Sequence, residues 1–529
     1  MFVSDILTED VTEWQEDSQV FISAPTGSGK TYFILHKLLP LALMYKREIL
    51  YFSNRQILHK QLISEACGIF DIDYELMSEE KTAEFPGITF TTYQNWQEKL
   101  LDNELMNPNP FYYYVVLDEV HFFVSDGYFN PESYRLFNWL PKMKKSVTLA
   151  ISATIEEVLP YFNFYNVEWT KVAQDDVRTI YSRRPHRIIN QLKGRAEFMY
   201  SYEMKQEKPQ YRIYIYDTID EIVECVNADE TGEKWLIFQS NKDTAAKELQ
   251  RKLQKDSCFI SADNKDGDVM NQIICDNSFN SSVLITTKVL DNGVSLHDRN
   301  IRKIVLDTVE QTEFLQMLGR RRTCEEDEQI QLYLPRHTKQ YFAWLLNRNI
   351  RPALELMEKS EDVILQELMK NPDVYDIARR YFYLQNGKLN KNYLAERQLR
   401  EQEKEYQKMM ECLEEDENAF VKEQLKWLEC DEQNIQIIEL SKVKKQAEME
   451  KLQMFLKRCQ GIEIKKVEQK IFREKMQKFM KNIIDKWNAR LPGLKRLNEG
   501  FSMLGIDMEI VAIGGKQKGE ETVWVLQEK

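Results

Sequence analysis

The stretch Val20-Phe-Ile-Ser-Ala-Pro-Thr-Gly-Ser-Gly-Lys-Thr31 decides the fold of this chain. Its first residues predict a buried β-strand, and the apolar residues at helical spacing after Thr31 predict a helix. A strand, a glycine-rich turn and a helix in this order are typical of a phosphate-binding loop, whose backbone N–H groups surround phosphate oxygens. We therefore expect a phosphate site made by Ala24, Pro25, Thr26, Gly27, Ser28, Gly29, Lys30 and Thr31.

The last two residues of this loop indicate the ligand. Lys30 supplies a point charge for the outer phosphates of a nucleotide, and the Thr31 hydroxyl is a ligand for magnesium. The pattern usually begins with glycine, and Ala24 stands in that position here. The expected cofactors are ATP and Mg²⁺.

The composition indicates a globular protein of several domains. A chain of 529 residues is long enough for about three domains, each with its own core. The net charge of −13 excludes a protein coated in positive charge, although a local basic patch is still able to bind nucleic acid. Eight scattered cysteines without a C-x-x-C pair favour the reducing cytoplasm. No signal peptide and no membrane-spanning run is visible, so we expect a cytoplasmic protein without a membrane partner.

Two further predicted strands end in polar residues. The strand at 48–53 is followed by Asn54 and Arg55, and the strand that begins at Ile88 ends at Thr91 and Thr92. Ligands bind at the carboxyl ends of parallel strands, so we expect these four residues to contact nucleic-acid phosphates. For the two threonines, an ordinary strand end explains the sequence equally well.

The strand Tyr112-Tyr-Tyr-Val-Val-Leu-Asp-Glu-Val-His121 carries two acids and a histidine at its tip. Opposite a phosphate-binding loop, Asp118 is suited to hold magnesium, usually through water. Glu119 is suited to orient and deprotonate the attacking water. The position of this quartet, inside a β/α alternation about ninety residues after the glycine-rich turn, makes the pattern specific.

The next strand ends in Ser152-Ala-Thr154, and with it the set resembles the superfamily 2 helicases of the DExH class. The resemblance covers residues 15–335 or so. It implies that Ser152, Thr154 and His121 couple the ATP state to nucleic-acid binding, whereas the residue type alone would favour an ordinary strand-end histidine at position 121.

A second α/β unit begins no later than the strand at 234–239, after a less regular passage. Thr286, Thr287, Asp291 and Gly293 match the family's fifth motif, which touches both nucleic acid and nucleotide. The later segment Gln316-Met-Leu-Gly-Arg-Arg-Arg322 looks like the final helicase motif, whose arginines reach the phosphates across the cleft. The family's second arginine would fall at position 323, which is Thr323, so the resemblance carries over Gln316, Arg320 and, one residue early, Arg322 as catalytic.

The expected fold is α/β, with two RecA-like lobes built on parallel sheets, followed by a mostly helical C-terminal region that ends in a β-hairpin. In the helical region, an apolar stripe runs from Val467 and Ile471 to Trp487. The hairpin bears Lys516 and Lys518, and it forms either a winged-helix module that touches nucleic acid or the closing element of a helical bundle around Trp524. The expected domains are lobe 1 at 1–170, an inter-lobe passage at 171–230, lobe 2 at 231–338, a charged helical region at 339–490 and this module at 491–529.

Three functions fit these motifs. One is an ATP-dependent helicase that unwinds a duplex, another is a translocase that moves along a duplex without separating strands, and the last is an ATP-gated scaffold with vestigial hydrolysis. Intact Lys30, Asp118 and Glu119 speak against the last of these. The expected partner is nucleic acid, with DNA favoured over RNA, and the helical region leaves protein partners open.

Overall fold

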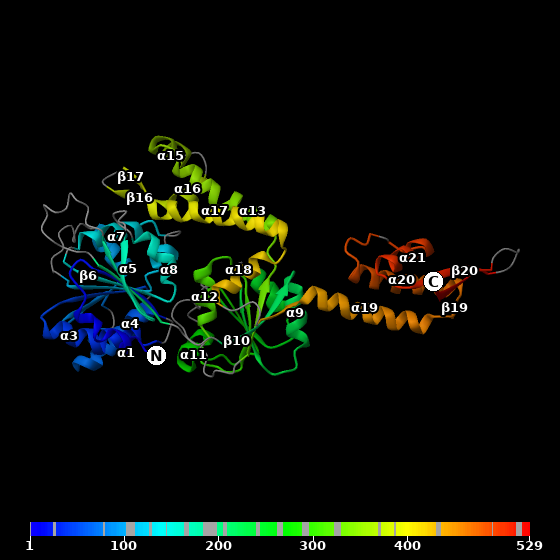
Figure 1. Cartoon of the computed structure of the whole chain (residues 1–529), viewed down its shortest axis with the longest axis horizontal. Coiled ribbons are helices and arrows are strands. Elements are labelled where there is room, and N and C mark those ends of the chain that lie inside the picture. Colours follow the sequence, from blue (N-terminus) through cyan, green and yellow to red (C-terminus); the bar gives the residue numbers. More distant parts are fainter. Residues whose placement is uncertain are drawn as a thin grey trace. The chain divides into compact units, whose positions relative to one another are not determined.

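The computed structural model describes residues 2–24, 28–54, 56–77, 80–101, 112–125, 130–143, 145–162, 169–183, 198–204, 209–239, 244–261, 268–287, 296–321, 329–368, 372–385, 388–429, 435–488, 490–514 and 521–529 (Figure 1). The chain forms two compact units. The first contains residues 1–211 and 226–435, and the second contains residues 212–225 and 436–529.

The first lobe is built on a nine-stranded sheet in the order β3-β4-β2-β5-β6-β1-β9-β8-β7. Its central strands are buried apolar runs, as parallel strands covered on both faces require. The parallel strands are β1 (Gln19–Ser23), β2 (Ile49–Ser53), β4 (Ile88–Thr92), β5 (Tyr114–Asp118), β6 (Val147–Ser152) and β9 (Phe198–Glu203). The antiparallel edge strands are β3 (Thr82–Phe85), β7 (Trp169–Gln174) and β8 (Arg178–Arg183).

The strand register brings the polar strand ends to one edge of this sheet. Ser23 pairs with Ser152, Ser53 with Thr92, and Asp118 with Ile151. The helices that follow the strands are α2 (Lys30–Phe33), a π-helical turn (Ile34–Leu38), α3 (Leu39–Met44), α4 (Gln56–Phe70), α5 (Tyr93–Leu101), α6 (Phe122–Ser125), α7 (Ser133–Trp139) and α8 (Ile155–Val158), and α1 (Val3–Leu7) precedes them all. The motifs predicted from the sequence therefore share one edge of the sheet.

The second lobe repeats this plan. Its parallel strands are neighbours in the order β12 (Ser257–Ile260), β13 (Val283–Thr286), β11 (Lys234–Phe238), β14 (Ile301–Leu306) and β15 (Gln329–Pro335). The accompanying helices are α10 (Thr244–Lys252), α11 (Asp268–Asp276) and α12 (Gln311–Gly319). Both RecA-like lobes of the expected α/β fold are thus present.

A helical region completes the first unit. It contains α13 (Lys339–Leu345), a π-helical turn (Leu346–Ile350), α14 (Arg351–Met357), α15 (Glu361–Leu368), α16 (Pro372–Tyr381), the hairpin of β16 (Phe382–Gln385) and β17 (Lys388–Lys391), α17 (Tyr393–Glu415) and α18 (Ala419–Trp427). Its core gathers apolar side chains from these helices, among them Phe342, Leu356, Leu399 and Phe420.

The second unit contains α9 (Ile219–Ala228), the strands β10 (Gln210–Tyr216) and β18 (Gln436–Glu439), and a C-terminal module. Strands β10 and β18 pair in parallel. The module contains α19 (Leu440–Cys459), β19 (Glu463–Ile464), α20 (Lys466–Ile483), α21 (Leu494–Met503), β20 (Met508–Ile513) and β21 (Val523–Glu528), with its sheet in the order β19-β21-β20. Gly500 lets α21 approach α20 closely, because a Cβ there would lie 3.0 Å from Met480.

Two expectations about local structure were wrong. The passage at 155–230, expected to be less regular, holds the strands β7 to β10 in its described part, and β9 lies directly beside β1. Tyr200 and Tyr202 of β9 are buried; Tyr200 OH donates to Glu13 O (3.1 Å), and Tyr202 OH accepts from Trp14 Nε1 (3.1 Å). In α20, Phe472, Met476 and Met480 form the buried stripe, whereas Val467 and Ile471 are 80% and 66% exposed.

Candidate functional site

The phosphate-binding loop is anchored at both of its described ends. The N–H of Ala24 donates to Ser152 O (3.0 Å), and the N–H of Val3 donates to Ser28 O (3.0 Å). Gly29 is the N-cap of α2 with φ +80°, a conformation that glycine adopts without strain. Pro25, Thr26 and Gly27 lie outside the described residues, while Thr31 follows Lys30 in the first turn of α2.

Lys30 joins this loop to the acidic tip of β5. Its side chain is largely buried, and its Nζ lies 3.2 Å from Glu119 Oε1 and 3.4 Å from Ala24 O. A buried ammonium is stable only when it is paired and hydrogen-bonded. The positive charge is therefore held at the point where the loop and the acidic strand meet.

Asp118 is held by two tyrosines that the sequence interpretation missed. Tyr51 OH donates to Asp118 Oδ2 (2.8 Å), Tyr93 OH donates to Asp118 O (2.9 Å), and the N–H of Glu119 donates to Asp118 Oδ1 (3.1 Å). A tyrosine inside an otherwise apolar buried strand needs a hydrogen-bond partner, and this need is the signal that could have identified Tyr51.

Glu119 turns the chain out of the strand. Its φ of +50° lies in the left-handed region, which a non-glycine residue occupies only when the surrounding structure holds it. The N–H of Val120 donates to Ile151 O (3.0 Å) and that of Phe122 to Glu119 O (2.9 Å). The strained residue is thus the one whose carboxylate meets Lys30.

The two acids have opposite pKa shifts. Burial, with the neighbouring Glu119 charge, raises the pKa of Asp118 to about 6. Burial acts in the same direction on Glu119, but the charges of Lys30 and Arg320 outweigh it and hold its pKa below the usual range. Of the pair, Glu119 is the more firmly ionised.

His121 links the acidic tip to the Ser-Ala-Thr segment. Its Nδ1 lies 3.1 Å from Ser152 Oγ and 3.3 Å from Glu119 Oε2. Ser152 Oγ also accepts the N–H of Thr154 (3.1 Å) and lies 3.3 Å from Thr154 Oγ1. The three residues expected to act together therefore form one hydrogen-bonded group.

The second lobe contributes two described residues to this site. Gln316 Nε2 lies 2.6 Å from His121 Nε2, and Arg320, at the end of α12, is close enough to lower the pKa of Glu119. Arg322, Asp291 and Gly293 lie outside the described residues. Arg321 points elsewhere, since its buried side chain donates from Nε to Ile301 O (2.7 Å).

Of the residues expected to contact nucleic acid, Arg55, Lys516 and Lys518 lie outside the described residues, and the others lie at strand ends. Thr91 Oγ1 accepts from Asn95 Nδ2 (3.0 Å), and Thr92 Oγ1 accepts the N–H of Asn95 (3.1 Å). Thr286 is buried and bonds Thr287 O (3.1 Å), while Asn54 O accepts from Gln94 Nε2 (3.4 Å). These threonine side chains thus bond within their own lobes.

Residues 3–157 match the family described as "Type III restriction enzyme, res subunit". Among curated proteins, no sequence matches this chain. Among solved structures, the chain is similar to S. cerevisiae Dbp5 bound to RNA and ADP BeF3, with 15% identity and a TM-score of 0.38 over 62% of this chain and 83% of that chain. It is also similar to the DEAD-box helicase Mss116 bound to ssRNA and UDP-BeF, with 14% identity and a TM-score of 0.42 over 71% of this chain and 81% of that chain.

The family match lies within the first lobe, and both lobes have the parallel α/β sheets of the expected RecA-like fold. Within the described part of the chain, no helix is long and apolar enough to cross a bilayer.

Proposed function

We propose that this protein is a DExH-type helicase, an ATPase that couples hydrolysis to unwinding of, or movement along, nucleic acid. The observation that carries the proposal is a continuous set of contacts, which runs from Lys30 through Glu119 and His121 to Gln316. It joins the phosphate-binding loop, the acidic tip and the second lobe. A change at the nucleotide site therefore reaches the lobe that must move.

Glu119 acts as the general base in this proposal. Its carboxylate is ionised and paired with Lys30, and the phosphates of an incoming nucleotide compete for the same ammonium. Loss of that partner leaves a buried carboxylate, which raises its basicity toward the attacking water.

Asp118 and Thr31 fit a magnesium ion. The Asp118 carboxylate is a hard oxygen ligand, and two hydrogen bonds orient it while leaving lone pairs free for a metal ion. Thr31 adds a hydroxyl oxygen as a second ligand. A magnesium ion held by these two residues would neutralise negative charge on the nucleotide phosphates.

The coupling residues are His121, Ser152 and Thr154, and the residues from the second lobe are Gln316, Arg320 and Arg322. Arg320 is already close enough to influence Glu119, which supports its assignment to the developing charge on the transferred phosphoryl group.

Asp291 and Gly293 complete the nucleotide contacts by resemblance to the fifth helicase motif. Nucleic acid runs along the strand ends at Asn54, Arg55, Thr91, Thr92, Thr286 and Thr287.

DNA is the favoured substrate, because the matched family is described by a restriction enzyme subunit. The two similar solved structures are bound to RNA, so both polymers belong in the test. From the eight scattered cysteines without a C-x-x-C pair we infer a cytoplasmic location.

The second unit supplies a basic surface for the phosphate backbone. Residues 436–529 contain 20 lysine and arginine residues against 13 aspartate and glutamate residues, although the whole chain has a net charge of −13. Lys466, Lys470, Lys478 and Lys481 are all exposed on α20, opposite its buried stripe. Over about 22 Å of helix, and with the exposed Glu474 between Lys470 and Lys478, they give this face a net positive charge suited to a polyanion.

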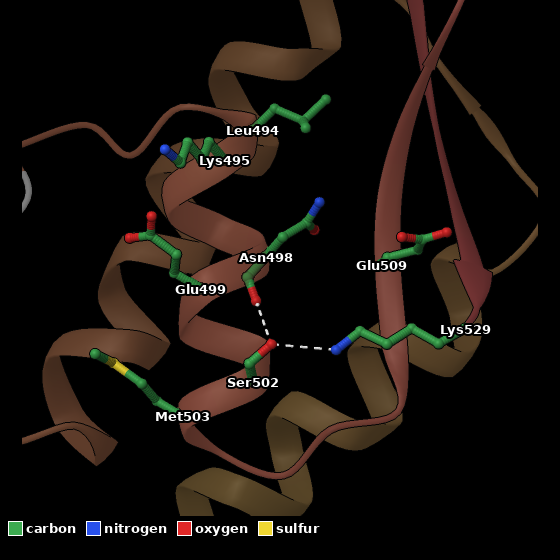
Figure 2. A pocket seen from close by; sticks show the side chains of 8 residues that line it. All are labelled: Leu494, Lys495, Asn498, Glu499, Ser502, Met503, Glu509 and Lys529. Carbon is green, nitrogen blue, oxygen red and sulfur yellow. Dashed lines mark hydrogen bonds between the residues drawn. The ribbon is translucent and has the colours of Figure 1, made fainter.

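The hollow beside α21 is less suited to phosphate. It has a volume of about 570 Å³ and is lined by two lysines and two glutamates, with Lys529 Nζ donating to Ser502 Oγ (3.1 Å) (Figure 2). These charges cancel, so we assign the backbone contact to α20 and to the hairpin lysines Lys516 and Lys518 rather than to this hollow.

A strand-displacement assay run beside an ATPase assay tests the proposal, with single-stranded DNA, duplex DNA and RNA each supplied. We expect nucleic-acid-stimulated ATP hydrolysis that disappears in Lys30→Ala. Stimulation without displacement favours the translocase, and nucleotide binding without hydrolysis in the wild type favours the ATP-gated scaffold.

A further inference from the structure

Helix α17 touches both lobes with side chains from one face. Gln398, Gln402 and Tyr406 are spaced four residues apart, so they lie along one side of the helix over about 12 Å. Two of these residues are glutamines, whose amides usually face solvent, yet Gln398 is only 3% exposed.

The first contact reaches the segment just after the acidic tip. Gln398 Nε2 donates to Val124 O (2.7 Å), and the N–H of Val124 donates to His121 O (2.8 Å). Leu394, one turn earlier, belongs to the apolar cluster of the first lobe. The start of α17 is therefore fixed to the element that carries His121.

The second contact reaches the helix that carries the second-lobe residues. Gln402 Nε2 (3.0 Å) and Tyr406 OH (2.8 Å) both donate to Glu310 Oε1. Glu310 is the N-cap of α12, on which Gln316 lies and at whose end Arg320 lies. Hydrogen bonds to a carboxylate are roughly twice as strong as neutral ones.

Helix α18 supports the same junction. Gln424 is fully buried, and its Nε2 donates to Thr308 O (3.2 Å), two residues before Glu310. The Trp427 ring lies 5.5 Å from the ring of Phe314 on α12, edge to face. The beginning of α12 is thus held from two neighbouring helices.

We propose that α17 positions the second-lobe residues against the acidic tip, with Gln402 and Tyr406 acting through Glu310 and Gln398 acting through Val124. This inference rests on the proposed ATPase function. None of these contacts uses a residue of the phosphate-binding loop or the acidic pair. They therefore hold the two lobes together without a bound nucleotide. Part of the docking of the lobes is therefore built into the chain, and turnover depends less on nucleic acid to bring Arg320 toward Glu119.

The test compares the full-length double variant Gln402→Ala/Tyr406→Phe with Tyr393→Phe. Tyr393 lies on the same helix and is 59% exposed, so its substitution is the matched control. In the double variant we expect kcat without nucleic acid to fall about tenfold or more, while the KM for ATP stays within about threefold of the wild-type value. Saturating nucleic acid should restore part of the lost kcat. Tyr393→Phe should match the wild type.

A double-mutant cycle separates positioning from general stability. If α17 acts through Arg320, the double variant should cost nothing further in an Arg320→Ala background. An equal fold-loss with and without Arg320, or a lower melting temperature at unchanged kcat, overturns the proposal.

Glu310 provides a second route if the double variant does not fold. Glu310→Gln keeps an oxygen that accepts both hydrogen bonds and should retain activity within about threefold, whereas Glu310→Ala should lose about tenfold. Equal activity of the two overturns the proposal.

Hydrogen exchange of the amides at 311–319 and 119–124 gives a measurement that needs no turnover. Faster exchange of both segments in the double variant supports the positioning role, whether or not the protein hydrolyses ATP. If it does not hydrolyse ATP, only the proposed function fails. Unchanged exchange overturns the positioning role.

Discussion

Nε2 of Gln316 and Nε2 of His121 lie 2.6 Å apart, one from each lobe. An amide NH₂ only donates, so the imidazole nitrogen accepts, and the proton of the neutral ring is assigned to Nδ1. That nitrogen faces Ser152 Oγ and Glu119 Oε2. The position of the second lobe thus sets the tautomer of a histidine beside the proposed general base.

We predict that Gln316→Ala lowers kcat by about tenfold while ATP affinity stays within a few-fold, because the nucleotide loses no direct contact. His121→Ala should give a similar loss. Since the two residues act as a pair, the double variant should resemble either single variant in steady-state ATPase assays. Multiplicative losses would show that they act separately.

Lys30→Ala should abolish turnover and weaken nucleotide binding, because the outer phosphates lose their point charge. Glu119→Gln should still bind ATP without hydrolysing it. Nucleotide binding followed by fluorescence, together with phosphate release, distinguishes the two variants. Near-normal turnover in Glu119→Gln rules out its role as general base.

The second-lobe arginines give a graded prediction. Arg320→Ala should slow hydrolysis by about a thousandfold with ATP affinity within a few-fold, and Arg322→Ala should also slow it strongly. Arg321→Ala is a control for effects on stability. Its side chain donates a buried hydrogen bond to Ile301 O, so its loss should lower the melting temperature. If Arg322→Ala equals the wild type while Arg320→Ala is inactive, Arg320 is the sole finger.

The pH dependence of kcat/KM for ATP should show an acid limb near pH 6. Asp118, whose pKa is raised to about 6, is ionised above that pH and able to hold magnesium, and it is protonated below it. The Tyr51 hydroxyl lowers this pKa, so Tyr51→Phe should move the limb to higher pH. Tyr93→Phe is the control, because its hydroxyl bonds the backbone oxygen of Asp118. If the acid limb of both variants stays at the wild-type pH, the titrating group is not Asp118.

The basic face of α20 is best tested by neutralising charge. Deleting residues 492–529 would remove Leu497, Phe501 and Leu526 from a core shared with α19 and α20, so the remainder would lose its packing. Lys466→Gln/Lys470→Gln/Lys478→Gln should instead weaken duplex binding and flatten its log–log salt slope by up to about 2.7. ATPase activity without nucleic acid should be unchanged.

The control for that experiment has the same change in net charge. Lys359, Lys404 and Lys426 each pair with a glutamate in the first unit, and their triple glutamine variant should keep the wild-type slope. Equal slopes in all three proteins would leave nucleic-acid binding to the lobes alone.

The parts of this site that come from local sequence were predictable. A glycine-rich turn between a strand and a helix, and acids at the tip of an apolar strand, have few structural alternatives, and the register of β1, β5 and β6 brings them together. Tyr51 and the three α17 residues were not predictable, because their roles depend on partners between 67 and 274 residues away. Residues at such separations meet through tertiary packing, which periodicity does not report.

One strand pairing has a consequence for synthesis. Strand β10 pairs with β18, and Arg212 Nε bonds Gln436 Oε1 across a sequence separation of 224 residues. At about 5–20 residues per second, roughly 11–45 s pass on the ribosome between the two partners. During that interval one edge of β10 presents unsatisfied N–H and C=O groups, a template for pairing with another chain. Truncated products that end before residue 436 should therefore aggregate more readily than the full-length protein.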